Sequence, residues 1–110
     1  MELSKRLDLH EMLCEILGSS KCYFQPPESV KLEYPCIIYK YDNNTRIHAD
    51  DIPYNITHQY IVTLVTRDPD DPRVNAMTEL PRMRFDRYYT ADNLHHYSFV
   101  YIMSKEARNV

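Results

Sequence analysis

Histidines close to carboxylates are the first residues of this chain that could do chemistry, because imidazole and carboxylate groups together bind metal ions or transfer protons. His48 is followed closely by Asp50 and Asp51, and His95 is adjacent to His96. The first group has no recognised spacing of zinc ligands. Two adjacent residues of a strand point to opposite faces, so the second pair does not chelate one ion. We therefore predict solvated polar side chains here and no bound metal.

A second group of acids stands in the sequence Asp68-Pro69-Asp70-Asp71-Pro72, which resembles the opening of a calcium-binding loop. Such a loop also requires a glycine and a distant glutamate that binds the ion with both oxygens. Asp71 followed by Pro72 instead fits a helix start, with aspartate as the N-cap and proline at the first helical position. The pattern predicts that these acids cap a helix.

Nucleophilic and cofactor chemistry find no support in the residue pattern. Gly18 is the single glycine, so glycine-rich phosphate loops are excluded, and no serine or cysteine stands in a glycine-flanked turn. Cys14, Cys22 and Cys36 lack the C-x-x-C spacing, and we expect buried or half-buried free thiols in a reducing cytoplasm. We expect no enzymatic activity, no cofactor and, without a run of 18 apolar residues, no membrane association.

The stretch Arg82–Tyr89 interleaves three arginines with aromatic residues, a combination that contacts phosphates or the carboxylates of a protein partner. Arg84, Arg87 and Tyr88 are our candidate interface residues there. Alternatively, the two arginines pair with Asp86 and other acids across the sheet. A net charge of -3, from 13 basic and 16 acidic residues, argues against nucleic-acid binding. We favour a protein contact or internal pairing.

The elements that must position these residues begin with a helix over residues 4–17. Its apolar residues follow the spacing of a one-sided helix, and they are Leu9, Met12, Leu13, Ile16 and Leu17. Ser4 is its expected N-cap and Gly18 its expected end. Residues 19–33, with Pro26-Pro27, form a connector in which neither helix nor central strand is expected.

Alternating apolar residues predict four strands: 34–41, 54–67, 82–89 and 94–103. In the longest strand one face carries Ile56, His58, Tyr60, Val62 and Leu64. In the third, one face carries Met83, Phe85, Arg87 and Tyr89. A short helix starts at Asp71-Pro72, and residues 104–110 form a polar tail.

The polar loop 42–53, together with the start of the long strand, forms a predicted hairpin arm for contacts with a neighbouring subunit. Its candidate interface residues are Arg46, His48, Asp50, Asp51, Tyr54 and His58. The chain is one domain of 110 residues. The predicted fold class is α+β, with a mainly antiparallel twisted sheet, flanking helices and the order α-β-β-α-β-β.

Three segments resemble a known group of proteins: P-C-I-I-Y-K-Y, P-Y-N-I-T-H-Q-Y-I-V-T-L-V-T-R-D-P-D and R-F-D-R-Y-Y-T-A-D-N-L-H-H-Y-S-F. Over about residues 34–101 the chain is similar to small neck and tail-completion proteins of long-tailed bacteriophages, the tail terminator type. The resemblance implies a twisted sheet with flanking helices that assembles into a ring, usually of six subunits.

The function implied by the resemblance is structural. A ring in the virion neck, assembled in the host cytoplasm, caps the tail tube, ends its polymerisation and joins it to the head connector. The implied partners are further copies of the chain in a hexamer, the tail tube protein and a head-side connector or stopper protein. DNA passes through the lumen without specific binding. The alternatives are another neck component (a head-closure or adaptor protein) and a small cytoplasmic protein-binding domain.

Overall fold

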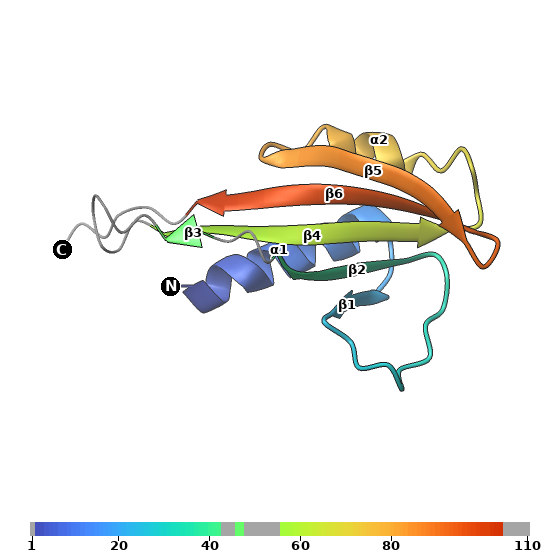
Figure 1. Cartoon of the computed structure of the whole chain (residues 1–110), viewed down its shortest axis with the longest axis horizontal. Helices are drawn as coiled ribbons and strands as arrows, with labels where there is room; N and C mark the ends of the chain where they lie inside the picture. Colours follow the sequence, from blue (N-terminus) through green and yellow to red (C-terminus); the bar gives the residue numbers. More distant parts are fainter. Residues whose placement is uncertain (1, 43–45, 48–55, 105–110) are drawn as a thin grey trace.

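The computed structural model describes residues 2–42, 46–47 and 56–104, which form an α+β domain (Figure 1). Its strands follow the order β1-β2-β4-β6-β5 in one mixed sheet, with β3 paired to β4. The elements are α1 (Glu2–Leu17), β1 (Cys22–Phe24), β2 (Cys36–Tyr41), β3 (Arg46–Ile47), β4 (Ile56–Thr66), α2 (Arg73–Thr78), β5 (Met83–Ala91) and β6 (Leu94–Ser104). No described helix has the length and apolar character needed to cross a bilayer.

Both helices cover the same face of the sheet, which we call the helix face (Figure 1). Leu9, Leu13 and Leu17, spaced by four residues, are buried in the main core, as the helical pattern predicts. Gly18 ends α1 with a φ of +80°, and its N–H donates to the carbonyl of Cys14 at 2.8 Å. A left-handed glycine therefore terminates the helix, as expected from the sequence.

The long strand β4 lies at the centre of the sheet and pairs antiparallel with β2 and β6. Tyr60, Val62 and Leu64 are buried together on the helix face, which confirms the prediction that they share one side of this strand. On the other face, Val65 packs with Cys36 in a smaller core. Partly buried residues of the connector and the neighbouring strands complete that core, namely Tyr23, Leu32, Tyr34 and Ile38.

The connector contains a strand that the pattern missed. β1 lies within residues 19–33 and runs parallel to β2, with Cys22 opposite Ile37. Three residues are too few to show an alternation, and the edge position demands little of their side chains. The sheet is therefore mixed, and the order of elements is α-β-β-β-β-α-β-β instead of α-β-β-α-β-β.

The predicted hairpin arm is described only at its base. β3 pairs antiparallel with the start of β4, with Arg46 opposite Thr57 and Ile47 opposite Ile56. Residues 43–45 and 48–55, which hold most of the predicted arm, lie outside the described residues, as do 105–110 of the predicted polar tail. The projecting arm remains a prediction.

A β-bulge in β5 changes which side chains share a face. Phe85 is opposite Phe99, but Arg87 is opposite Ser98, so the register shifts by one residue between them. An extra residue in one strand reverses the alternation beyond it. The prediction that Phe85 and Arg87 share a face is therefore wrong. Phe85 lies on one face with Tyr88, while Arg87 lies on the opposite face.

Candidate protein-interaction surface

Strand β5 forms one edge of the sheet and is unusually open to solvent. Its only strand neighbour in the described part of the chain is β6, and every residue from Arg84 to Ala91 is exposed. Among the described residues, five large apolar side chains are exposed, and three of them are Phe85, Tyr88 and Tyr89, at 46%, 47% and 43%. A long edge with exposed aromatic side chains is suited to docking another protein.

The exposed rings of β5 are held in place by rings of β6. Tyr88 stacks on His95 with a centroid distance of 5.9 Å, and its hydroxyl hydrogen-bonds to Nδ1 of His95 at 2.7 Å. Tyr88 also contacts Tyr97 at 4.9 Å, whose hydroxyl donates to the carbonyl of Pro69 at 2.9 Å. Burial, with Tyr88 and nearby aspartates adding to it, raises the pKa of Tyr97. Rings fixed in this way lose little freedom when a partner binds.

The opposite face of the same two strands carries a second stacked pair. Tyr89 lies over His96 with a centroid distance of 4.7 Å and an interplanar angle of 14°. His95 and His96 thus contact different faces of the ribbon, as predicted for adjacent residues of a strand. The part of the chain that the structure describes holds no cluster of three or more potential metal ligands.

Arg84 and Arg87 are on the same face as Tyr89, because they lie opposite Val100 and Ser98 of β6, and Tyr89 lies opposite His96. Nε of Arg87 is 3.4 Å from a carboxylate oxygen of Asp86, and both side chains are exposed. Arg84 makes no ion pair with any described residue. An exposed pair between neighbours contributes little to stability, so internal pairing explains these arginines only in part. We call Arg84, Arg87 and Tyr89 the arginine face of β5.

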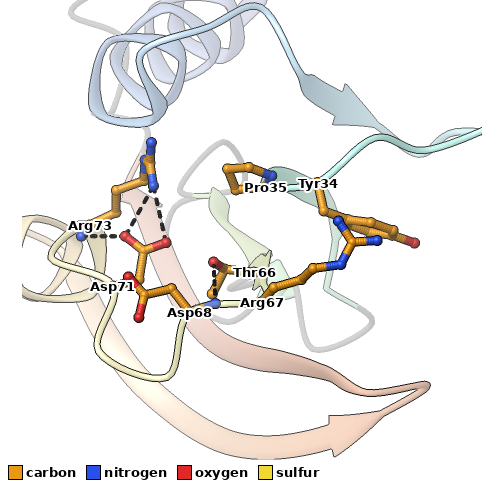
Figure 2. A pocket seen from close by; sticks show the side chains of 7 residues that line it. All are labelled: Tyr34, Pro35, Thr66, Arg67, Asp68, Asp71 and Arg73. Atoms are coloured by element: carbon orange, nitrogen blue, oxygen red, sulfur yellow. Dashed lines mark hydrogen bonds and ion pairs between the residues drawn. The ribbon is translucent and has the colours of Figure 1, made fainter.

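A hollow of roughly 350 Å³ at the C-terminal end of β4 is a second feature of the described residues that could bind a ligand (Figure 2). It is lined by Tyr34, Pro35, Thr66, Arg67, Asp68, Asp71 and Arg73. The guanidinium of Arg67 lies 5.7 Å from the centre of the Tyr34 ring, where the cation contacts the aromatic face.

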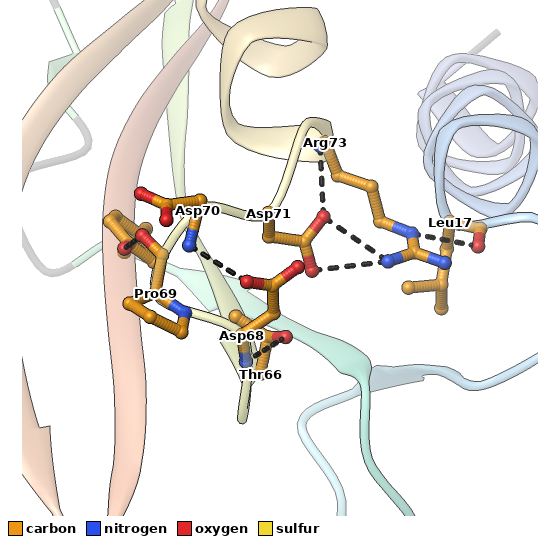
Figure 3. Close-up of polar contacts among 8 residues, drawn as sticks. Leu17, Thr66, Asp68, Pro69, Asp70, Asp71 and Arg73 are labelled. Carbon is orange, nitrogen blue, oxygen red and sulfur yellow. Dashed lines mark hydrogen bonds and ion pairs between the residues drawn. The ribbon is translucent and has the colours of Figure 1, made fainter.

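The charged groups of this hollow already have structural partners (Figure 3). The buried carboxylate of Asp71 accepts the backbone N–H of Arg73 at 2.9 Å and two bonds from its Nη1 at 3.1 and 3.0 Å. Nε of Arg73 donates to the carbonyl of Leu17 at 3.1 Å, which ties the start of α2 to the end of α1. Asp68 accepts the N–H of Asp70 at 2.9 Å. These contacts hold neighbouring elements together, and they leave few polar groups of the hollow available to bind a ligand.

The same contacts test the predicted helix start. Helix α2 begins at Arg73, one residue later than expected, with Pro72 in the N-cap position. Asp71 nevertheless satisfies a free N–H of the first turn, which is the capping role predicted for it.

The cysteines lie at the opposite edge from β5. No disulfide forms among Cys14, Cys22 and Cys36; the first is half-buried and the other two are buried, as predicted. Burial raises the pKa of Cys36 from its ordinary value of 9.0 to about 11. Burial, together with the neighbouring thiol of Cys14, raises the pKa of Cys22 further. Because the thiolate is the nucleophilic form, these buried thiols are unreactive at neutral pH.

The predicted interface residues separate into two groups. Arg84, Arg87 and Tyr88 stand together on the open edge, on two faces of β5. Arg46 and His58 are placed by their backbone only, in β3 and in the adjoining part of β4. His48, Asp50, Asp51 and Tyr54 lie outside the described residues.

The sequence analysis singled out the stretch that contains Phe85 and Tyr89 but did not name these two residues, and it did not place His95 and His96 on this surface. The exposure of the two aromatic residues of β5 depends on β5 being an edge strand, and the two half-buried histidines join the surface through their contacts with its tyrosines. In comparisons with family models, curated proteins and solved structures, nothing matches this chain.

Proposed function

We propose that this protein is a structural component of the head–tail junction of a long-tailed phage. In this role it forms a ring that caps the tail tube, ends tube polymerisation and joins the tube to the head connector. The resemblance of residues 34–101 to tail terminators motivates the proposal. The open edge at β5 is the observation that supports it best, because its exposed residues are suited to assembly.

A closed ring needs two different patches on each subunit, since head-to-tail contacts join unlike surfaces. The β5 surface has the composition of one such patch. Tyrosine, phenylalanine and arginine are enriched at protein interfaces, and fixed aromatic rings act as anchors. The residues involved are Phe85, Tyr88, Tyr89, Arg84 and Arg87.

The partners follow from the proposed place in the virion. Copies of the chain form the ring, usually a hexamer, and the tail tube protein and a head-side connector or stopper protein dock on its two ends. DNA passes through the lumen without being bound specifically. A chain with a net charge of -3 fits that passage, because tight phosphate contacts would retard the DNA. Catalysis and cofactors have no part in this proposal.

The proposal is tested by mixing the purified protein with polymerising tail tube protein and measuring tube lengths by electron microscopy. The wild type is expected to limit tube length and to scatter light as a species of six times the 13.2 kDa chain mass. A Tyr88→Lys/Tyr89→Lys variant, altered only at exposed positions, is expected to leave tubes unrestricted. Unrestricted growth with the wild type would contradict the terminator role. Binding to the head connector alone would favour another neck component.

A further inference from the structure

We infer that the arginine face of β5 docks on the outer side of helix α1 of a second copy of this chain. The inference rests on the self-association contained in the proposed function and specifies which two surfaces meet. It is carried by opposite charge, by matching spacing and by one exposed large side chain on each surface, Tyr89 on β5 and Leu7 on α1.

The outer side of α1 carries an acidic stripe, which we define as Asp8, Glu11 and Glu15 together with Leu7. The three acids are exposed and stand at i, i+3 and i+7, so they lie on one side of the helix, opposite its buried leucines. Leu7 is 46% exposed beside them.

Arg6 does not neutralise the acidic stripe, because its side chain lies on the core side of α1. Its guanidinium is 4.4 Å from the centre of the Phe24 ring, and Nη1 donates to the hydroxyl of Tyr39 at 3.5 Å. Among the side chains that the structure describes, none forms an ion pair with these three carboxylates, which leaves them available to an external cation.

The spacing of the arginines matches that of the acids. Arg84 and Arg87 lie opposite Val100 and Ser98, two residues apart on β6, which is about 6.7 Å along a strand. Glu11 and Glu15 are four residues apart on α1, which is about 6 Å along a helix. Without the bulge at Asp86 the two arginines would point to opposite faces, so the bulge makes this match possible.

The exposed apolar side chains also lie mainly on these two elements. Of the five large ones among the described residues, Leu7 is on α1 and three are on β5. The fifth, Tyr41, stacks on Tyr60 with a centroid distance of 5.1 Å. Of the three on β5, Tyr89 shares the arginine face, whereas Phe85 and Tyr88 lie on the other face. Contact between α1 and the arginine face would thus cover Tyr89 and Leu7 at the same place where arginine meets carboxylate.

The two surfaces cannot meet within one chain. Helix α1 packs on the helix face of the sheet, whereas Arg84 and Arg87 lie on the opposite face. Each copy therefore presents an arginine face to one neighbour and an acidic stripe to the other. This head-to-tail arrangement closes into a ring where the rotation per subunit permits it.

Charge reversal tests the pairing. The variants Arg84→Glu/Arg87→Glu and Glu11→Lys/Glu15→Lys are each expected to self-associate at least about tenfold more weakly than the wild type in sedimentation velocity, because like charges then face each other. An equimolar mixture of the two is expected to associate again. The variant that combines all four reversals is also expected to recover self-association.

The matched control for the β5 reversal is Lys31→Glu/Lys40→Glu. It lowers the net charge by the same amount at two other exposed positions and is expected to associate like the wild type. Circular dichroism checks that every variant is folded. If the wild type associates and the β5 reversal associates equally well, the inference is overturned while the proposed ring stands. Failure of the four-residue variant and of the mixture to recover would overturn the pairing. A wild type that stays monomeric at every concentration would contradict both this pairing and the proposed ring.

Discussion

At one edge of the sheet the outer side of β2 is covered along its length, whereas at the other edge β5 lies open. Residues 21–25, which include β1, lie beside β2. The carbonyl of Lys21 accepts the N–H of Ile37. Gln25 donates its N–H to the carbonyl of Tyr39, and its side-chain oxygen accepts the N–H of Tyr41. Pro26-Pro27 follows, and proline cannot donate to a further strand. This edge therefore offers another chain only the short strand β1 of three residues.

The open edge has none of these protections. β5 has nine residues without proline, and its outer side has no strand partner in the described chain. Proteins usually shorten, cover or interrupt such an edge, because it invites pairing with other chains, and in β5 the bulge at Asp86 is the interruption that the structure shows. The proposed function assigns recognition to the open edge, and the contrast between the two edges supports that proposal.

The largest loss of stability is expected from a substitution in the core beneath the open edge. Phe99 of β6 is fully buried, and Phe85 packs on it edge to face with a centroid distance of 5.5 Å. Phe99→Ala is expected to lower the free energy of unfolding by about 3 to 5 kcal/mol in urea denaturation, because it leaves a cavity.

Phe85→Ala is the matched control, since it removes the exposed member of the same pair. We expect a loss of under about 1.5 kcal/mol in stability and a measurable loss of self-association. If Phe85→Ala and Phe99→Ala lost equal stability, Phe85 would be part of the core, and β5 would not differ from a covered edge strand.

A smaller loss of stability is expected from substitutions in the turn that connects β4 to α2. Asp71→Ala removes the buried carboxylate that holds Arg73 and caps α2, and it is expected to cost about 2 kcal/mol of stability. Asp71→Asn keeps an oxygen for the backbone N–H and is expected to lose about half as much. Thermal or urea unfolding measures both, and identical losses would argue against the capping bond.

Alkaline pH is expected to lower the stability of the fold, and buried Cys36, beside the covered edge, is expected to contribute first. The pKa of Cys36 is raised by burial from 9.0 to about 11, so the folded state disfavours the thiolate. Above pH 9 the unfolded chain releases this proton first, and stability is expected to fall as pH rises from about 9 to 11. Buried Tyr39 and Tyr60, whose pKa values burial also raises, add to the loss above about pH 10.

Urea unfolding at several pH values measures this slope. A Cys22→Ala/Cys36→Ala variant is expected to have a smaller slope between pH 9 and 10. An unchanged slope in that variant would assign the effect to other groups.

The smallest effect is expected from the hydroxyl of Tyr88. Tyr88→Phe removes the hydrogen bond to His95 but keeps the stacked ring, so stability and self-association are expected to change by about 0.5 kcal/mol or less. Tyr88→Ala removes the ring and is expected to weaken association clearly. If Tyr88→Phe weakened association in sedimentation as much as Tyr88→Ala does, the hydroxyl would be the anchor and not the ring.

Much of the fold was predictable from local patterns. The spacing of Leu9, Leu13 and Leu17 predicted α1, and Gly18 predicted its end. The predicted start was wrong, because Ser4, the expected N-cap, lies inside a helix that begins at Glu2. The alternation in residues 54–67 predicted a long strand and the residues that share one of its sides. These features depend on residues close in sequence, which is why periodicity detects them.

What was missed depends on contacts distant in sequence. Three residues of β1 become a strand only because β2 lies beside them, and the bulge after Phe85 appears only in the register with β6. The arginines were recognisable as interface candidates. Their common face with Tyr89 was not, because one inserted residue reverses every side chain beyond it.

Hydrogen exchange at two protein concentrations tests most directly whether β5 is the assembly edge. Backbone amides of an open edge exchange freely in the monomer and slow down when a partner covers them. The account predicts that raising the concentration slows exchange in β5 and on α1, and leaves exchange in β1 unchanged. Concentration-independent exchange in β5, or slowing confined to β1, would contradict it.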